Sequence, residues 1–225
     1  MCGFVGIIDK NNIETKKIAL ENMMNRIIHR GPDSAGTYVD EKAALGFRRL
    51  SIIDLEHGSQ PIYNENKDLV IVFNGEIYNF QEIKEDLVSK GHTFLTHTDT
   101  EVIIHGFEEY GKDIVTKLRG MFAFVIWNTK TNVMFGARDM FGIKPFYYSN
   151  TEDAFLFGSE IKSFIEHPCF HKEMNKSALK PYLTFQYSAL NETFFKGVYK
   201  LETRALLYVC KWKMESKHTI PSSFI

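Results

Sequence analysis

The hydrophobic and polar positions of this chain repeat with two periods, one typical of strands and the other of helices. A continuous apolar run over Gly3–Ile8 predicts a buried strand close to the N-terminus. Over Lys16–His29 the apolar side chains recur every three or four positions, which indicates a helix with one buried face. Gly31 and Pro32 follow and are expected to end that helix.

Two more segments have the helical period. The segment "NFQEIKEDLVSKG" is expected to begin at the cap residue Asn79 and to end at Gly91. Its inward-facing residues are predicted to be Phe80, Ile83, Leu87 and Val88. The segment "TDTEVIIHGFEEYG" is expected to form another helix that ends near Gly111.

The remaining pattern is mostly short strands. Strands are predicted over Gly36–Val39, Ala43–Leu50 and Leu69–Phe73, and then over four aromatic-rich segments that suggest a meander: "MFAFVIWN", "VMFGAR", "PFYYS" and "AFLFGS". Short helices are possible over Ser159–Glu166 and Lys176–Leu183, and "ALLYVCKWKME" alternates like one final strand before a tail of about a dozen residues. Hairpin-connected strands under separate helices predict an α+β fold.

Composition excludes several classes of protein. The 225 residues are enough for one well-buried domain, and a formal charge of −1 argues against a nucleic-acid-binding surface. No apolar run reaches the roughly 18 residues of a membrane span, and no secretory signal is visible. The three cysteines and eight histidines show no disulfide or metal-ligand spacing, so we expect no metal site. A reducing cytoplasm is the expected location.

Cys2 is the first candidate for chemistry. If Met1 is removed, Cys2 carries both a thiol and a free α-amine, whose pKa is about 7.7–8.0. Such an amine can take the thiol proton and return it to a leaving group, so one residue supplies nucleophile and base. The alternative is that Cys2 is a small buried apolar residue with no chemical role.

The sequence surrounding Cys2 and the segments that follow it resemble a known family. In order, they are "MCGFVGI", "HRGPDSAG", "RRLSIIDL", "FNGEIYNF", "TDTEVIIHGFEEYG", "LRGMFAFVIWN", "ARDMFGIKPFYY" and "FGSEIKS". Together they are similar to the glutaminase domain of glutamine-hydrolysing asparagine synthetases, which are class II glutamine amidotransferases. The resemblance covers residues 2–201 and implies a four-layer αββα N-terminal-nucleophile hydrolase fold, with two antiparallel sheets between helix layers.

The resemblance also implies catalytic residues. Cys2 matches the nucleophile, which would form a γ-glutamyl thioester. Asn74 and Gly75 match the two donors of an oxyanion hole, one a side-chain amide and the other a backbone N–H. Asn-Gly after a strand is also a strong hairpin signal. The flanking "FNGEIYN" favours the site, and a tight turn there would expose the N–H of Gly75.

Other residues match the substrate-binding positions of the family. Arg49 matches the residue that binds the α-carboxylate of glutamine, which a planar guanidinium can grip with two parallel hydrogen bonds. Strand alternation sends Arg48 to the opposite face. The residues that follow Arg49 are expected to bind the ligand through their backbone: Leu50, Ser51, Ile52 and Ile53.

An acidic pair completes the implied site. Asp99 matches the residue that binds the α-ammonium group, with Glu76 close by. The alternative for this segment is helix capping, because Thr98 and Glu101 have the spacing of a capping box. Both interpretations are compatible if Thr98 caps the helix while Asp99 points into the pocket.

The chain departs from the family pattern after Leu201. Residues 202–225 are predicted to be a divergent strand and tail, and they contain no Ser-Gly-Gly pyrophosphate loop. We therefore expect hydrolysis of L-glutamine to glutamate and ammonia without a cofactor, with ATP and Mg²⁺ needed only by a synthetase domain absent from this chain. A synthetase domain or subunit is the expected ammonia acceptor. The alternatives are an amidotransferase for another acceptor and a glutamine-binding module without turnover.

Overall fold

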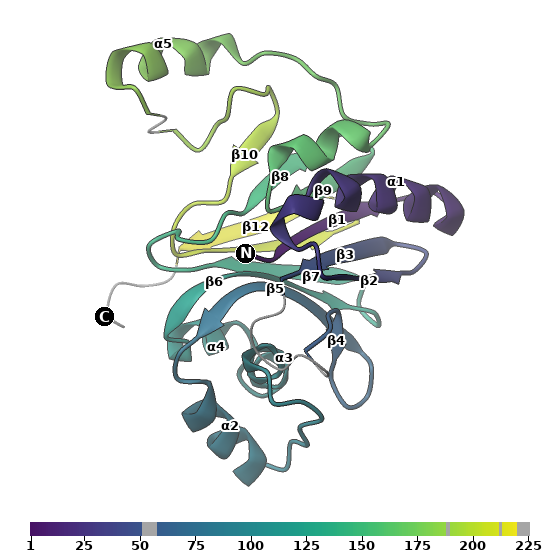
Figure 1. Ribbon diagram of the computed structural model, residues 1–225, viewed down its shortest axis with the longest axis vertical. Helices are drawn as coiled ribbons and strands as arrows, with labels where there is room; N and C mark the ends of the chain where they lie inside the picture. The colour runs from purple at the N-terminus through teal and green to yellow at the C-terminus, as the bar shows by residue number, and fades with distance from the viewer. Residues whose placement is uncertain (51–57, 188–189, 212, 220–225) are drawn as a thin grey trace.

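The computed structural model describes residues 1–50, 58–187, 190–211 and 213–219. In these residues twelve strands form two six-stranded antiparallel sheets, which pack face to face (Figure 1). The first sheet has the order β10 (Val198–Lys200), β8 (Tyr147–Asn150), β9 (Ala154–Gly158), β1 (Gly3–Asp9), β3 (Ala43–Arg49) and β2 (Ser34–Val39). The second has the order β12 (Lys213–Thr219), β11 (Ala205–Cys210), β7 (Val133–Arg138), β6 (Gly120–Asn128), β5 (Leu69–Ile77) and β4 (Ile62–Tyr63).

Helices cover the outer faces of both sheets. The α-helices are α1 (Ile13–Arg26), α2 (Phe80–Ser89), α3 (Asp99–Tyr110), α4 (Ile114–Lys117) and α5 (Lys176–Phe185), and the 3₁₀ turns are η1 (Ile28–Arg30), η2 (Gly111–Asp113) and η3 (Ile161–Glu166). In Figure 1, α1 lies over β1 and β3, whereas α2, α3 and α4 lie beyond the second sheet. The result is four layers in the order helix, sheet, sheet, helix.

Strand β1 shows why its hydrophobic run is continuous. Phe4 and Ile8 point into the core between the two sheets, while Val5 and Ile7 point to the opposite face and pack against α1. A strand that is buried on both faces needs apolar residues at every position rather than at alternate ones. Because successive side chains point to opposite faces, the continuous apolar run fits a strand inside the first sheet, where β1 lies between β9 and β3.

The aromatic-rich strands do not form the single meander that their spacing suggests. β6 and β7 pair with each other in the second sheet, whereas β8 and β9 pair with each other in the first. The segment between β7 and β8 therefore crosses from one sheet to the other. The prediction of four consecutive strands is correct, but they form two pairs in different sheets instead of one meander.

The C-terminal segment also differs from its prediction. The expected single strand is a hairpin: β11 pairs with β7 on one side and with β12 on the other. Lys211 lies at the turn with a φ of 48°, which breaks the extended backbone. Residues 213–219, part of which the sequence pattern assigns to a tail, thus form the edge strand of the second sheet.

Smaller corrections concern helix surfaces and boundaries. α1 begins at Ile13 rather than Lys16, because the side chain of Asn12 accepts a hydrogen bond from the Thr15 N–H at 2.9 Å. Val88 was expected to face inward, but it lies on the outer face of α2 and is exposed. The strand that contains Asn74 continues to Ile77 rather than stopping at Phe73.

Candidate active site

A cavity of about 110 Å³ lies where the first sheet, the second sheet and α3 meet. Six of the residues predicted from the sequence line it: Cys2, Arg49, Leu50, Gly75, Glu76 and Asp99. They come from the start of β1, the end of β3, the end of β5 and the start of α3. Segments up to 97 residues apart in the chain are thus brought to one site.

Hydrogen bonds hold Cys2 in position directly before β1. The Leu50 N–H lies 3.3 Å from the sulfur, and the sulfur lies 3.5 Å from the Leu50 carbonyl oxygen. On its other side, the Arg30 Nε donates to the Cys2 carbonyl at 2.9 Å, while Nη1 of the same side chain pairs with Glu160 at 3.1 Å. Arg30 therefore fixes the backbone of Cys2 and leaves its thiol facing the cavity.

Gly75 presents its backbone N–H to the same cavity. In a strand, N–H groups of every second residue point to the same edge. The Phe73 N–H donates to Gln60 Oε1 at 2.6 Å and the Ile77 N–H donates to Asp99 Oδ2 at 2.8 Å, both on the edge of β5 away from β6. Gly75 lies between them, so its N–H points to that edge too.

Glycine is required at this position by its neighbours across the strands. A Cβ atom on Gly75 would lie 2.3 Å from the Met121 carbonyl oxygen and 2.8 Å from the Phe122 Cα. Neither backbone atom can move without disturbing the pairing of β5 with β6. The turn alternative and our argument for an exposed N–H both assumed that Asn74 and Gly75 form a hairpin turn. Both are wrong on this point, because the two residues lie inside β5 and pair with Ala123 and Phe122 of β6.

Asn74 carries a buried donor without a partner. Its side chain is 2% exposed, and its Nδ2 has no hydrogen-bond partner among the described residues. Because an unpaired buried N–H costs about 1–3 kcal/mol, such a donor is a candidate for binding a ligand. Asn74 does not itself line the cavity surface, but it adjoins Gly75, which does.

The strand alternation predicted for the two arginines is confirmed. Arg49 is 6% exposed and faces the cavity. Arg48 turns to the other face of β3, where its Nε donates to the Met24 carbonyl at 3.2 Å and its Nη2 to Asn25 Oδ1 at 2.6 Å. Arg49 thus lines the cavity, and Arg48 attaches β3 to α1.

Asp99 is the first residue of α3 and sits at the cavity beside Glu76. Burial raises the pKa of Asp99 to about 6, and the negative charge of Glu76 adds to this rise, while the hydrogen bond from the Ile77 N–H opposes it. A cation bound at this carboxylate would offset both the cost of burying its negative charge and the repulsion from Glu76. The site therefore favours a positively charged group next to Asp99.

The capping-box interpretation of this segment is wrong. Thr98 is at the N-cap position of α3 but makes no capping hydrogen bond through its side chain. Glu101 instead accepts hydrogen bonds from the N–H groups of Leu95 and Thr96, each at 2.7 Å. Glu101 thus organises the loop before α3, and Asp99 is left to face the cavity.

We predict that protonation of Asp99 weakens ligand binding at low pH. Above pH 7 the carboxylate is charged, whereas below its pKa of about 6 it becomes neutral and can no longer pair with an ammonium group. The KM for an α-amino acid substrate should therefore rise roughly tenfold for each pH unit below 6. Asp99→Asn should remove this pH dependence and raise KM at pH 8 in the same kinetic assay.

The same shift predicts a change in stability. A carboxyl group with a raised pKa in the folded state stabilises the fold below pH 3.8, and this contribution is lost as pH rises through about 6. Without ligand, Asp99→Asn should therefore be more stable than the unmodified chain at pH 8, by at most about 3 kcal/mol. Urea unfolding at pH 4 and pH 8 measures this, and equal stability of both chains at pH 8 would contradict it.

Some lining residues were not predicted from the sequence. They are Phe47, Gly58, Gln60, Phe73, Thr98 and Thr100. Gln60 has a clear structural role, because its amide accepts from the Phe73 N–H and donates to the Phe73 carbonyl at 3.0 Å, as a neighbouring strand would. Its position in a loop before Pro61 gave no signal of this pairing. The predicted residues Ser51, Ile52 and Ile53 lie outside the described residues.

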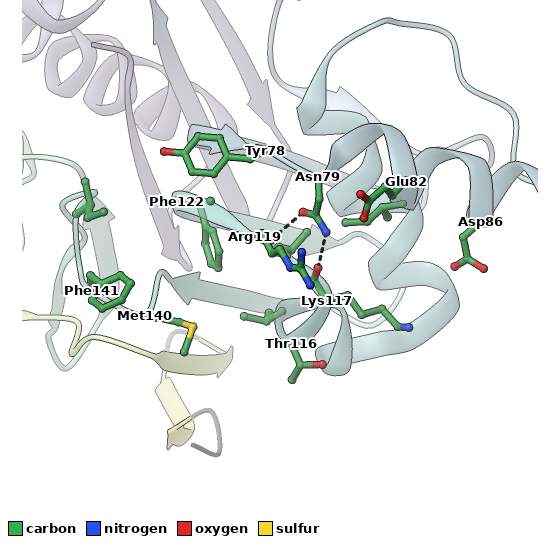
Figure 2. A pocket seen from close by; sticks show the side chains of 15 residues that line it. Tyr78, Asn79, Glu82, Asp86, Thr116, Lys117, Arg119, Phe122, Met140 and Phe141 are labelled. Atoms are coloured by element: carbon green, nitrogen blue, oxygen red, sulfur yellow. Dashed lines mark hydrogen bonds between the residues drawn. The ribbon is translucent and has the colours of Figure 1, made fainter. Parts of the chain in front are cut away.

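A larger cavity, of about 710 Å³, lies between α2, α4 and the loop after β7 (Figure 2). None of the predicted site residues lines it. Asn79 stands at its edge: Nδ2 donates to the Lys117 carbonyl at 3.0 Å and Oδ1 accepts from the Arg119 N–H at 2.9 Å. Asn79 is the N-cap residue of α2, as expected, but its side chain makes no capping hydrogen bond and holds the segment of Lys117 and Arg119 instead.

Comparisons with known proteins show the family to which the chain is similar. The model of one protein family, described as a glutamine amidotransferase domain, matches residues 1–219. Asparagine synthetase [glutamine-hydrolyzing] 1 of Bacillus subtilis is 45% identical over 205 residues, which are 90% of this chain and 32% of that protein. A probable asparagine synthetase [glutamine-hydrolyzing] of Dictyostelium discoideum is 42% identical over 76% of this chain and 31% of its own length.

A solved structure supports the fold. The glutamine phosphoribosylpyrophosphate amidotransferase from B. subtilis superposes with a TM-score of 0.70 at 20% identity, covering 99% of this chain and 50% of that one. The predicted four-layer αββα N-terminal-nucleophile hydrolase fold is thereby confirmed. The chain spans about a third of the length of the sequence relatives. In the described residues no helix is long and apolar enough to cross a membrane.

Proposed function

The chain belongs to the family of class II glutamine amidotransferase domains, and we propose that its smaller cavity hydrolyses the side-chain amide of L-glutamine through a thioester on Cys2. The observation that carries this proposal is the meeting of four groups at one cavity: the thiol of Cys2, the guanidinium of Arg49, the N–H of Gly75 and the carboxylate of Asp99.

The charged groups match the two ends of a free amino acid. Arg49 is suited to bind the α-carboxylate with two parallel hydrogen bonds. Asp99, whose pKa is raised by burial and by the charge of Glu76, is suited to bind the α-ammonium group. Holding both groups would leave the side chain of glutamine to reach Cys2, which lies in the same cavity.

The chemistry then needs a base and an oxyanion hole. Removal of Met1, which is 62% exposed, would free the α-amine of Cys2 to accept the thiol proton. The sulfur would attack the amide carbon, and the oxygen would take up negative charge facing the Gly75 N–H and the Asn74 amide. As the C–N bond breaks, the amine returns the proton and ammonia leaves; water then cleaves the C–S bond and releases glutamate.

We further propose that the ammonia is used by an acceptor of the asparagine synthetase type. The support is the 45% identity to a relative of that name over 90% of this chain. The relatives are about three times as long, so the acceptor chemistry belongs to a domain or subunit beyond the matched region. ATP and Mg²⁺ would serve that acceptor, and glutamine hydrolysis itself would need no cofactor.

Glutamine alone tests the proposed hydrolysis. The purified chain, with removal of Met1 verified by intact mass, should release glutamate and ammonia in equal amounts without ATP or Mg²⁺. Brief incubation followed by acid quenching should trap glutamyl thioester on Cys2, visible in the mass of its peptide. Binding of glutamine with no ammonia release from the processed chain would instead support a binding module.

We predict that Arg49→Lys raises KM for glutamine more than it lowers kcat. Lysine keeps the positive charge but loses the paired donors, which costs about 1–3 kcal/mol and corresponds to roughly a 5- to 150-fold higher KM. Arg48→Lys is the matched control, because this neighbour contacts α1 rather than the cavity. Equal effects of the two substitutions on KM would remove Arg49 from the binding site.

A further inference from the structure

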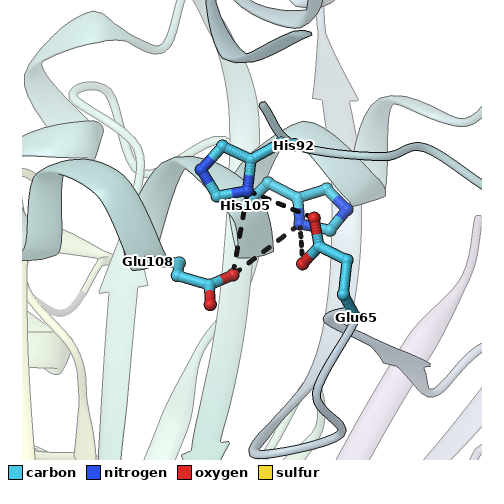
Figure 3. Close-up of side chains that lie close together, drawn as sticks. All are labelled: Glu65, His92, His105 and Glu108. Carbon is cyan, nitrogen blue, oxygen red and sulfur yellow. Dashed lines mark hydrogen bonds and ion pairs between the residues drawn. The ribbon is translucent and has the colours of Figure 1, made fainter. Parts of the chain in front are cut away.

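Four side chains meet where α3, the segment after α2 and the β4–β5 turn come together: Glu65, His92, His105 and Glu108 (Figure 3). Glu65 belongs to the turn between β4 and β5, His92 follows α2, and the other two lie on α3. One ligand atom of each lies within 4.8 Å of the others. In the part of the chain that the structure describes, this group is the candidate for holding a metal ion.

No short sequence motif joins the two histidines of this cluster. His92 and His105 are 13 positions apart, and the packing of α2 against α3 brings their ring centroids to 5.3 Å. Our expectation of no metal site rested on spacing alone. Spacing along the chain does not reveal ligands that different elements contribute.

His105 is oriented as a metal ligand would be. Its Nε2 faces Glu101 Oε1 at 3.4 Å, so a proton on Nε2 is directed to a carboxylate on the same helix. The Nδ1 atom is then left with its lone pair facing the cluster. Carboxylates that bind the second ring nitrogen in this way are typical of metal-ligating histidines.

The Nδ1 atom of His105 has a close neighbour but no hydrogen bond. It lies 3.1 Å from Glu65 Oε2, yet this buried nitrogen has no partner of suitable direction among the described residues. Two ligands of one ion both point at the ion and therefore lie beside each other rather than pointing at each other. The short contact without a hydrogen bond is the arrangement that a shared cation requires.

Charge and distance also fit a cation. Glu65 and Glu108 face the rings, and Glu101 and Glu109 lie within 4 Å of a ring nitrogen, so carboxylates outnumber histidines. His92 Nδ1 lies 3.3 Å from Glu65 Oε1 and 3.9 Å from Glu108 Oε2. Ligand atoms around a tetrahedral zinc ion are about 3.3–3.4 Å apart, given bonds of roughly 2.0–2.1 Å.

We propose that Glu65, His92, His105 and Glu108 form a binding site for a divalent transition-metal ion, for which Zn²⁺ is the best match. Two imidazoles and two carboxylates are ligands that Zn²⁺ accepts in four-coordinate geometry. The ion would tie the β4–β5 turn, the segment after α2 and α3 together. It would therefore stabilise the helix whose first residue is Asp99.

Metal titration of the purified chain tests this site. To keep the active-site thiol out of the measurement, the titrations use the Cys2→Ala background. We expect one Zn²⁺ per chain by calorimetry and by elemental analysis after dialysis, together with a higher melting temperature. Co²⁺ should give the intense visible bands of a four-coordinate site without a thiolate charge-transfer band.

Two ligand variants and one control separate this site from weaker surface binding. His92→Gln and Glu108→Gln, both at partly exposed positions, should each weaken Zn²⁺ binding at least about 100-fold, since loss of even an outer-shell partner costs roughly 10–100-fold. His171→Gln, an exposed histidine outside the cluster, should leave it unchanged. Absence of Zn²⁺ binding, or equal affinity in all three variants, would overturn the proposal and leave the cluster as a set of ion pairs.

Discussion

Cys2→Ala is expected to abolish release of ammonia from glutamine while leaving glutamine binding nearly unchanged. Removing the nucleophile of a hydrolase lowers kcat by about 10⁵-fold or more. Binding should persist because Arg49, Gly75 and Asp99 also line the cavity and do not depend on the sulfur. An enzymatic ammonia assay gives the loss of turnover, and calorimetry with glutamine gives the dissociation constant.

Cys169→Ala is the matched control for this substitution. Cys169 is a half-buried thiol that packs against the α1 side of the first sheet, far along the chain from the cavity residues. The Cys169→Ala variant should release ammonia from glutamine as fast as the unmodified chain. If Cys2→Ala lost glutamine affinity as completely as turnover, the division between a reacting sulfur and separate binding groups would be wrong.

Most of the longer strands and helices of this chain could be predicted because their hydrophobic periods are local, whereas the short elements β4, β10 and α4 were missed. β1 and α3 are examples: β1 is apolar from Gly3 to Ile8, and α3 has apolar residues at helical spacing. Their pairing could not be predicted in the same way. β7 lies between β6 and β11, and β11 comes almost seventy residues later in the chain, so the meander suggested by neighbouring strands was wrong.

Asn74 and Gly75 show how tertiary contacts override a local signal. The dipeptide favours a tight turn, but β6 pairs with β5 at every position from Leu69 to Ile77 and keeps the backbone extended. The resemblance to a family identified both residues as site candidates. Only the alternation of N–H groups along β5 shows how a residue inside a strand can direct a donor to the cavity.

Candidate residues with no local motif were the hardest to find. Gln60 completes the edge of β5 at Phe73, and His92 meets His105 only because α2 packs on α3. In each case the partners are more than ten positions apart, and one of them lies outside the helices and strands. Such sites follow from the packing of the fold, so a sequence pattern cannot show them before the packing is known.

The second large effect is expected from Asn74→Ala, which should lower kcat for glutamine by about 10²–10³-fold with little change in KM. The reason is that the Asn74 amide would bind the oxygen of glutamine only when negative charge develops on it. Groups that act in the transition state alone change kcat rather than ground-state binding. Steady-state kinetics with the ammonia assay separates the two constants.

Asn64→Ala is the matched control, because Asn64 is also a buried asparagine next to β5. Its Oδ1 accepts from the Leu69 N–H at 3.0 Å and its Nδ2 donates to Glu108 at 3.3 Å, so its amide is fully engaged in the fold. Asn64→Ala should therefore lower the free energy of unfolding by about 1–3 kcal/mol and leave kcat unchanged.

Asn74→Ala should instead lower kcat and leave the stability almost unchanged, because no described residue accepts from Nδ2 in the folded protein. Its free energy of unfolding should change by about 1 kcal/mol or less, since removal of an unpaired buried donor offsets the lost packing. A large loss of stability with normal kcat would mean that the Asn74 amide supports β5 rather than the reaction. Gly75 would then be the remaining oxyanion donor that this strand supplies.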